Sequence, residues 1–256
     1  GSDKPSISPT ICPEHLSDAA SERVRAVVVS HLHGSFAEIA RIRQICDQHG
    51  WVLIEDACQV IGGRIQNQPA GSFGHLATLS FGGSKLISAG SGGAILANDD
   101  RLAARLGQLL DRPGDTFPLA PLQAAVIGPQ LDRLDQLTRI RNRVAQFLRQ
   151  DLFPDLHGWV PLCDLNMHAQ NTAGCLENGN DTKTSNLGNL QAYYKFAWLL
   201  PSSEERDDVI AAGLKLGLPL GVGFRSMSRC SSRRCRKPVP TPRADVLGEQ
   251  LVVMDH

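Results

Sequence analysis

A strand–helix–strand pattern near the start of the chain constrains its fold more than any other feature. Residues 27–29, all valine, predict a short buried strand. Apolar residues at helical spacing then predict an amphipathic helix over 36–49, which ends at Gly50. Residues 51–54 predict a second buried strand. Such a βαβ unit requires two parallel strands joined by a right-handed crossover.

The later segments extend this pattern to an α/β fold. We expect a mostly parallel central sheet flanked by helices in a large domain over 1–121, followed by a long helix and a smaller C-terminal α+β domain over 122–256. Residues 1–22 and 161–190 are polar and show no periodicity. The other expected elements are strands at 76–81 and 92–97, a helix at 98–110 capped by Asn98 or Asp99, a helical stretch at 122–152 kinked at Pro129, a strand at 193–200, a helix at 203–216 and a strand at 251–256.

Composition and charge exclude several classes of protein. Of the 256 residues, 42% are hydrophobic and 20% are charged, so a core can form and global disorder is excluded. The 26 Lys and Arg residues balance the 26 Asp and Glu residues, so no net field favours nucleic acid or an anionic membrane. The sequence shows no apolar run of roughly 18 residues and no signal-peptide pattern. We therefore expect a soluble, cytoplasmic protein that binds neither nucleic acid nor membrane.

The cysteines and the two ends of the chain add two expectations. No two of the seven cysteines stand at CxxC spacing, which argues against a zinc knuckle or a thioredoxin-type motif and favours reduced thiols. The chain begins with Gly1 and Ser2 and ends in an apolar run that is typical of a strand. We expect the sequence to be incomplete at one or both ends.

Polar residues follow the predicted strands at the ends where an open parallel sheet binds its ligands. Asp56 and Lys85 come from two different loops, and we expect these loops to form one site. The polar residues at these strand ends are Ser30, His31 and His33, then Glu55, Asp56 and Gln59, then residues 80–85, which include Ser80 and Lys85.

The residue types at these positions favour pyridoxal 5'-phosphate as a cofactor. A lysine forms its Schiff base, a carboxylate keeps its pyridine nitrogen protonated, and hydroxyl and N–H groups hold its phosphate. Residues 80–85 and 90–93 are rich in glycine and serine, which suits phosphate binding by a loop. The plainer alternative is a surface lysine in a flexible loop and an aspartate that caps the turn after a strand.

Residues 24–110 resemble the pyridoxal-phosphate-dependent sugar aminotransferases of the DegT/DnrJ/StrS family, which have the fold type I aminotransferase architecture. Weaker matches continue as far as Arg225, and the segment 161–190 matches least. The motifs that carry the resemblance are His31-Leu32-His33-Gly34, Ile54-Glu55-Asp56-Ala57-Cys58-Gln59, Gly71-Ser72-Phe73-Gly74, Ser80-Phe81 with Lys85, and Gly92-Gly93-Ala94.

The resemblance implies roles for four residues. Lys85 is similar to the lysine that forms the Schiff base and moves the proton, and Asp56 to the partner of the pyridinium nitrogen. Gln59 is similar to the residue that contacts the ring hydroxyl, and Ser80 to a phosphate ligand. A lysine at position 85 argues against the family's deoxygenating dehydratases.

The resemblance also implies an activity and an assembly. We expect a pyridoxal-phosphate-dependent aminotransferase that moves an amino group from an amino acid to a keto-sugar or a similar cyclic ketone, free or nucleotide-linked. The family implies a homodimer with cofactor sites at the subunit interface. If the segment that normally precedes residue 24 is absent, the strand after Arg25 and the stretch 122–152 would expose apolar surface. We then expect poor solubility for these 256 residues alone.

Two departures from the family motivate an alternative function. Residues 1–23 contain neither the family's phosphate-binding turn nor its aromatic residue that stacks on the cofactor. Residues 114–118 replace an Asn-containing motif that reaches the neighbouring subunit's cofactor. The alternative is a non-catalytic relative that acts as a binding or regulatory protein.

Three other features allow weaker interpretations. His31 and His33 share one face of a strand, but no third ligand follows at metal spacing, so we expect no metal site. The basic segment 225–237 is typical of a solvated loop, and the alternatives are contact with a nucleotide-sugar diphosphate or with nucleic acid. Cys230 and Cys235 lie among its arginines, which can lower thiol pKa values, and a redox role is a further alternative.

Overall fold

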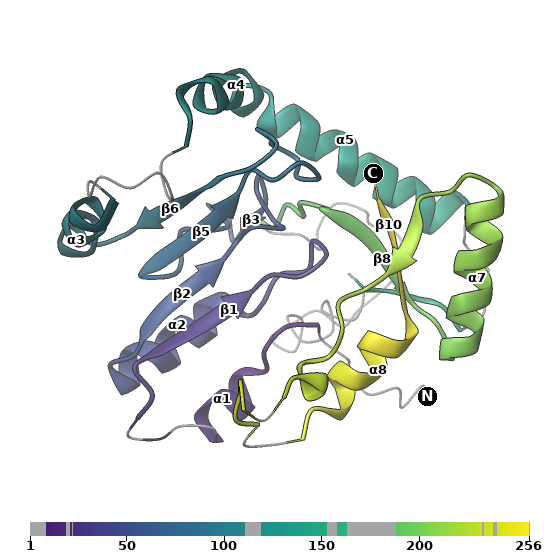
Figure 1. The fold of residues 1–256 in the computed structure, drawn as a ribbon, viewed down its shortest axis with the longest axis horizontal. Coiled ribbons are helices and arrows are strands. Elements are labelled where there is room, and N and C mark those ends of the chain that lie inside the picture. Colours follow the sequence, from purple (N-terminus) through teal and green to yellow (C-terminus); the bar gives the residue numbers. More distant parts are fainter. Residues whose placement is uncertain are drawn as a thin grey trace.

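Two β-sheets organise the protein. The computed structural model describes residues 9–18, 21, 23–110, 119–152, 158–162, 188–231, 233–237 and 240–255. The two sheets occupy the two sides of the molecule in Figure 1, and helices pack against each of them. The expected α/β class with a mostly parallel sheet is confirmed. The expectations for 114–118 and for most of 161–190 lie outside the described residues.

The first sheet contains the predicted βαβ unit. Its strand order is β1-β2-β5-β6. β1 (Ala26–Ser30) pairs in parallel with β2 (Val52–Asp56), and β2 pairs in parallel with β5 (Leu76–Ser80). β6 (Gly93–Ala97) is antiparallel to β5. The helix α2 (Ile39–His49) joins β1 to β2 as a crossover, as the sequence pattern predicts.

The helix predicted over 36–49 begins later than expected, at Ile39. The N–H group of Ala37 donates to His31 Nδ1 (3.0 Å), and this contact holds the chain in a loop before the helix. Gly50 ends the helix in the left-handed conformation, with φ at 66°, as predicted.

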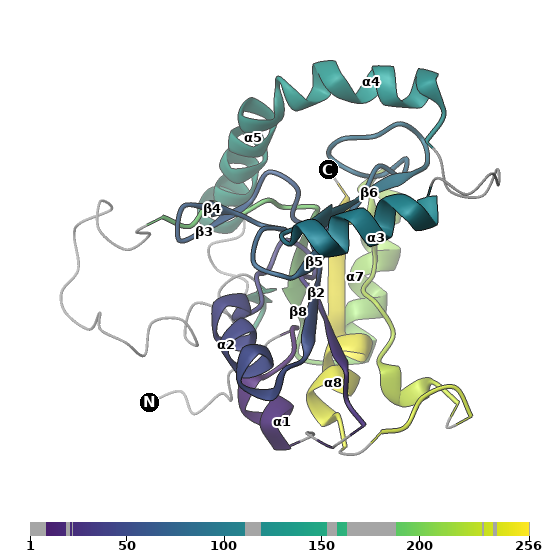
Figure 2. The ribbon, with the colours of Figure 1, turned by 90° about the vertical axis from the view of Figure 1, so that its left-hand side faces the viewer.

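Only one face of the first sheet is covered by α2. Side chains alternate between the two faces along a strand, and Val27, Val29 and Leu53 point toward α2 and are buried. Val28 points to the other face and is 62% exposed. The expectation of a buried strand is therefore wrong for Val28, because α2 lies on one side of the sheet (Figure 2).

The second sheet is antiparallel and forms the expected C-terminal α+β part. Its order is β7-β8-β10-β9, so the last strand of the chain lies inside the sheet. The predictions of a strand near 193–200, a helix at 203–216 and a strand at 251–256 are confirmed. The elements are β7 (Val160–Pro161), β8 (Lys195–Leu199), α7 (Ser203–Lys215), β9 (Leu220–Val222), a 3-10 turn (Met227–Arg229), α8 (Pro242–Gln250) and β10 (Leu251–Asp255).

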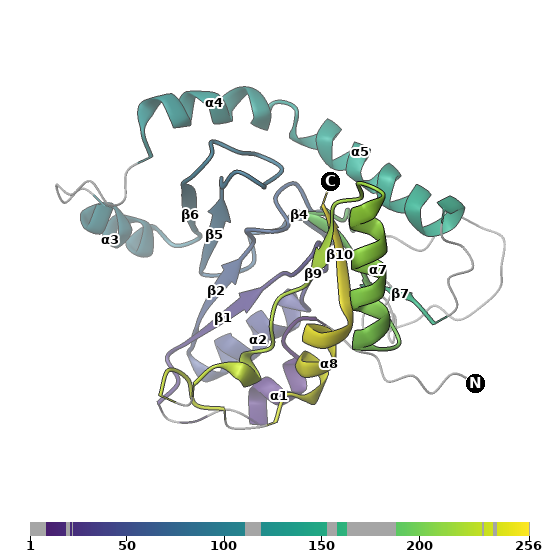
Figure 3. The same cartoon turned by 45° about the vertical axis from the view of Figure 1, so that its right-hand side comes forward.

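The long helical stretch connects the two sheets as two helices, which Figure 3 shows along the top of the molecule. α4 (Pro121–Leu131) and α5 (Leu134–Phe147) are followed by a π-helical turn (Leu148–Leu152). The predicted kink at Pro129 is wrong, because the break follows α4 at residues 132–133. Pro129 lies inside α4, near its C-terminal end, and the helix continues past it to Leu131.

Two helices and a small hairpin complete the described elements. α1 (Pro13–Asp18) lies where the sequence showed no periodicity, because six residues are too short to show a helical repeat. α3 (Asp100–Leu110) is the helix expected over 98–110, and Asp99 accepts the Leu102 N–H group at its start (3.0 Å). β3 and β4 pair as a hairpin at Arg64–Ile65 and Gln68–Pro69. Among the described helices, none has both the length and the apolar character to cross a membrane.

One buried carboxylate joins the first sheet to two loops. Glu55, in β2, is fully buried on the side of α2. Its Oε1 accepts from His31 Nε2 (3.0 Å) and from the Gly71 N–H group (2.6 Å). Its Oε2 accepts from the N–H groups of Phe73 (2.9 Å) and Gly74 (3.0 Å).

These donors compensate for the burial of a charge. Burial by itself raises the pKa of a carboxyl group, but the hydrogen bonds from His31, Gly71 and Gly74 outweigh it and hold the pKa of Glu55 below its usual value. His31 Nδ1 accepts the Ala37 N–H group, which places the ring proton on Nε2, toward Glu55. Gly74 is required here because a Cβ atom would clash with the backbone carbonyl oxygen of Leu76.

We predict that Glu55→Gln lowers the free energy of unfolding by about 3 kcal/mol, because in either orientation the amide NH2 group would face two N–H donors. Urea titration at neutral pH, followed by circular dichroism, measures the loss. Glu14→Gln is the matched control, since Glu14 is in an exposed ion pair with Arg41 and should cost less than about 1 kcal/mol. Equal losses in the two variants would contradict the prediction.

The same network predicts how stability depends on pH. Since the folded-state pKa of Glu55 is below its usual 4.5, its contribution is complete above pH 4.5 and is lost as the pH falls further. The difference in free energy of unfolding between the wild type and Glu55→Gln should therefore shrink as the pH is lowered to about 3. A difference that stays constant down to this pH would show that folding does not lower the pKa of Glu55.

Candidate active site

Four polar side chains share one face and one end of the first sheet. The register pairs Ser30 with Asp56 and Asp56 with Thr78, and Ser80 lies two residues beyond Thr78 on β5. Paired residues and residues two apart on a strand point to the same face. This is the face opposite α2, at the carboxyl ends of β1, β2 and β5, where the sequence analysis expected the site.

Asp56 is held as a carboxylate. Its Oδ2 accepts from Ser30 Oγ (2.9 Å), and its Oδ1 accepts from the Cys58 N–H group (3.1 Å). Partial burial raises its pKa, but the hydrogen bonds from Cys58 and Ser30 outweigh this effect, so the pKa of Asp56 lies below its usual value. An ionised, partly buried carboxylate at this place is suited to pair with a cationic group of a ligand.

The turn after β2 also carries Gln59 and Cys58. Gln59 Oε1 accepts the His33 N–H group (2.8 Å), which joins the loops that follow β1 and β2. Cys58 Sγ contacts the Thr78 carbonyl oxygen (3.5 Å). Burial is the main cause that raises the pKa of the Cys58 thiol to about 11, and the hydrogen bond to Asp56 adds to this effect. Cys58 is therefore a neutral thiol at physiological pH.

Lys85 lies in the connection between β5 and β6. The Lys85 N–H group donates to the Gly82 carbonyl oxygen (3.0 Å), which closes a tight turn, and the Gly82 N–H group contacts Ser80 Oγ (3.4 Å). Lys85 Nζ lies over the ring of Tyr194, 4.0 Å from its centroid. The Tyr194 hydroxyl lies 2.9 Å from Ser84 Oγ.

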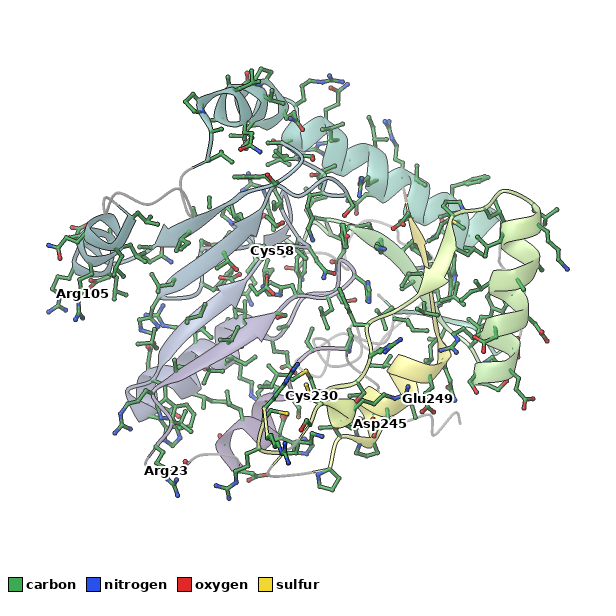
Figure 4. The ribbon with its side chains drawn as sticks, viewed as in Figure 1. Arg23, Cys58, Arg105, Cys230, Asp245 and Glu249 are labelled. Carbon is green, nitrogen blue, oxygen red and sulfur yellow. The ribbon has the colours of Figure 1, made fainter. Side chains whose placement is uncertain are left out.

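A small hollow brings these segments together at the carboxyl ends of the strands. Gln59 and Lys85 both line it, and Asp56 lies beside it through its contact with Cys58. Figure 4 shows Cys58 at this end of the first sheet. Ser80 is not among the lining residues. These are Cys58, Gln59, Ile61, Lys85, Leu86, Ala192, Tyr193 and Tyr194.

Cys230, within the basic segment 225–237, lies away from Cys58 and from the hollow that Cys58 lines. Figure 4 shows Cys230 beside α8, on the same side as Glu249 and far from Cys58. Arg229, within the segment, forms an ion pair with Glu249 (3.1 Å).

The two histidines considered as metal ligands have other contacts. Both ring nitrogens of His31 are hydrogen-bonded, to Glu55 and to Ala37. The His33 ring stacks on Phe224, with centroids 5.3 Å apart, and burial lowers its pKa to about 4. Within the described ranges, no group of three or more histidine, cysteine, aspartate or glutamate side chains is placed to bind a metal.

Two features of this region could not be predicted from the sequence. Tyr194 comes from the segment before β8, more than a hundred residues after Lys85, and no local pattern links the two residues. Glu55 stood among the polar residues at a strand end, but nothing in its spacing showed that it is buried.

Comparison with known proteins identifies relatives over much of the chain. The sequence model of the DegT/DnrJ/EryC1/StrS aminotransferase family matches residues 6–183. A GDP-perosamine synthase from Caulobacter vibrioides is 34% identical over 142 residues, which are 51% of this chain and 38% of the relative. The erythromycin biosynthesis sensory transduction protein EryC1 of Saccharopolyspora erythraea is 31% identical over 172 residues, which are 60% of this chain and 47% of the relative. The matched region thus spans less than half the length of these curated relatives.

Solved structures share the fold over nearly the whole chain. The aminotransferase TlmJ of Streptoalloteichus hindustanus has a TM-score of 0.78 at 19% identity and covers 98% of this chain, which spans 65% of TlmJ. The aminotransferase PseC of Helicobacter pylori, which takes part in pseudoaminic acid biosynthesis, has a TM-score of 0.78 at 18% identity, with 96% of this chain and 65% of PseC covered. These likenesses establish the fold, and the sequence match establishes the family. The chain belongs to the DegT/DnrJ/EryC1/StrS aminotransferase family.

Proposed function

We propose that this protein is a pyridoxal-phosphate-dependent aminotransferase that moves an amino group from an amino acid to a keto-sugar or a similar cyclic ketone. The observation that carries the proposal is the ionised Asp56 beside a hollow that contains Gln59 and Lys85. The acceptor class is supported by the names of relatives, which include a GDP-perosamine synthase and an L-glutamine:2-deoxy-scyllo-inosose aminotransferase. Nucleotide-linked sugars are therefore among the acceptors that we propose.

The described donor set fits the cofactor. Pyridoxal phosphate requires an amine, a carboxylate for its ring nitrogen, and donors for its phosphate. Lys85 would supply the amine, and Asp56 would pair with the ring nitrogen because its hydrogen bonds keep it ionised. Gln59 would contact the ring hydroxyl. Ser80, next to the N–H group of Gly82, would bind the phosphate.

The cofactor, when bound, supplies an electron sink that stabilises negative charge on the substrate's α-carbon. The protein's own contribution is to hold charges and move protons. The Lys85 amine would take the proton from the α-carbon of the amino acid and return a proton in the second half of the reaction. The Asp56 carboxylate would stabilise positive charge on the ring nitrogen throughout.

The proposal predicts a covalent adduct at one lysine. Incubation of the purified protein with pyridoxal phosphate should give a new visible absorption band, and borohydride reduction should add the cofactor mass to the peptide that contains Lys85. Lys85→Arg keeps the positive charge but cannot form the adduct, so both signals should be lost. Peptide mass spectrometry and absorption spectroscopy measure them.

Lys195→Arg is the matched control, because Lys195 is also near Tyr194 (5.6 Å from the ring centroid) but pairs with Asp255. It should keep the band and the adduct. An adduct that persists in Lys85→Arg would show that another lysine is used. No adduct in the wild type would instead favour the non-catalytic binding or regulatory alternative.

We also propose that the protein acts as a homodimer. α4 and α5 carry large apolar side chains on their surface, and a soluble monomer rarely exposes a large apolar patch. A second copy that covers these helices would remove this surface from water. The exposed side chains are Leu122, Val126, Leu131, Ile140, Val144 and Phe147.

The dimer proposal predicts that Leu122→Asp weakens self-association at least about 10-fold, because a buried charge replaces an apolar contact. Leu216→Asp is the matched control, since Leu122 and Leu216 are each 78% exposed and Leu216 lies at the end of α7. Sedimentation across a dilution series measures the effect. A wild type that stays monomeric at every concentration would contradict the proposal.

We further propose that the protein is cytoplasmic and that its chain forms two domains. The described cysteines are free thiols, which suits a reducing compartment. Residues 1–121 would form the cofactor-binding domain, and 122–256 would supply the long helices and the smaller domain.

A further inference from the structure

Tyr194 contacts two successive residues of the loop that carries Lys85. Its hydroxyl lies 2.9 Å from Ser84 Oγ, and the face of its ring lies 4.0 Å from Lys85 Nζ. The ammonium group therefore lies over the ring face, where the electron density of an aromatic ring attracts a cation. The hydroxyl binds the neighbouring residue instead of the lysine.

The loop needs such an anchor because of its sequence. Gly82 and Gly83 directly precede Ser84 and Lys85, and glycine loses more conformational freedom on ordering than any other residue. The local contacts of this turn are the bond from the Lys85 N–H group to Gly82 and the long contact from Gly82 to Ser80. Neither of them restrains the Lys85 side chain.

Tyr194 is itself held in place by the helix α5. Arg141 Nη1 donates to the carbonyl oxygens of Tyr193 (2.8 Å) and Tyr194 (3.1 Å). The loop after β1 packs on the same segment at Gly34, where a Cβ atom would lie 3.0 Å from the Tyr193 Cα. The ring thus belongs to a segment fixed from two sides, and it can restrain a more adaptable loop.

We propose that Tyr194 is a positioning residue for Lys85: its ring holds the ammonium group at the hollow, and its hydroxyl holds the loop through Ser84. The meaning of this contact for catalysis depends on the function proposed above, but the contact itself does not. The Lys85 side chain must leave the ring face before its amine can react with another molecule, so loss of the ring should make it more reactive.

The reactivity of Lys85 in the cofactor-free protein tests the proposal. A small acylating reagent labels lysine amines that are free to react, and peptide mass spectrometry gives the labelling rate of Lys85 relative to the exposed Lys215. Tyr194→Leu removes the ring and should raise this ratio about 2- to 5-fold, as expected from a cation–π contact of about 0.5–1 kcal/mol. Tyr194→Phe keeps the ring and should leave the ratio unchanged.

The same two variants separate the ring from the hydroxyl. Hydrogen exchange of residues 82–86 should become faster in Tyr194→Phe, because the bond to Ser84 is lost. A Tyr194→Leu variant with the wild-type ratio, or a Tyr194→Phe variant that labels as fast as Tyr194→Leu, would overturn the proposal. Failure of the wild type to form a cofactor adduct would count against the proposed function only.

A second measurement covers the case in which Tyr194→Leu does not fold. The protein has two tyrosines, so tyrosine-labelled NMR gives two sets of ring signals, which Tyr193→Phe assigns. Lys85→Met removes the cation and should shift the Tyr194 signals, whereas Lys195→Met should shift them less, because Lys195 is farther from the ring. Equal shifts, or none, would overturn the proposal.

Discussion

The hydrogen-bonded carboxylate of Glu55 is the constraint on which the candidate site depends. It accepts hydrogen bonds from the N–H groups of Gly71 and Gly74, which lie in one loop. It also accepts one from the ring of His31, which lies in the loop after β1. A carboxylate this deeply buried is stable only when its donors are in place, so the two loops and β2 must adopt one arrangement together. Because side chains alternate along a strand, the burial of Glu55 directs Asp56 to the opposite face.

Asp56 and its hydrogen-bond partner Ser30 lie on that opposite face. Asp56 receives hydrogen bonds from Ser30 and Cys58 and stays ionised, while Glu55 one residue earlier serves the structure. Two adjacent carboxylates thus have different surroundings, because Glu55 faces the core and Asp56 faces the opposite side of the sheet, beside the hollow. The site is completed from the other half of the chain, because Tyr194 reaches Lys85 from the segment before β8.

Several parts of this arrangement could be predicted from local pattern. The valine-rich run, the helical period and Gly50 were enough to predict the βαβ unit, and Asp56, Gln59 and Lys85 were expected at one end of the sheet. Other parts could not be predicted. The sequence predicted a kink at Pro129, because a proline removes a helical hydrogen bond, but the break between α4 and α5 lies after Leu131.

The sequence by itself determined the βαβ unit, the family, and the residue types that could serve a phosphate-bearing cofactor, because these depend on periodicity and on motifs within short segments. The tertiary structure alone decided which of two adjacent carboxylates is buried and which aromatic ring meets Lys85. It also decided that Val28 and the apolar side chains of α4 and α5 remain at the surface. The physical reason is that burial and contact depend on which segments pack together, and segments a hundred residues apart leave no trace of that packing in local spacing.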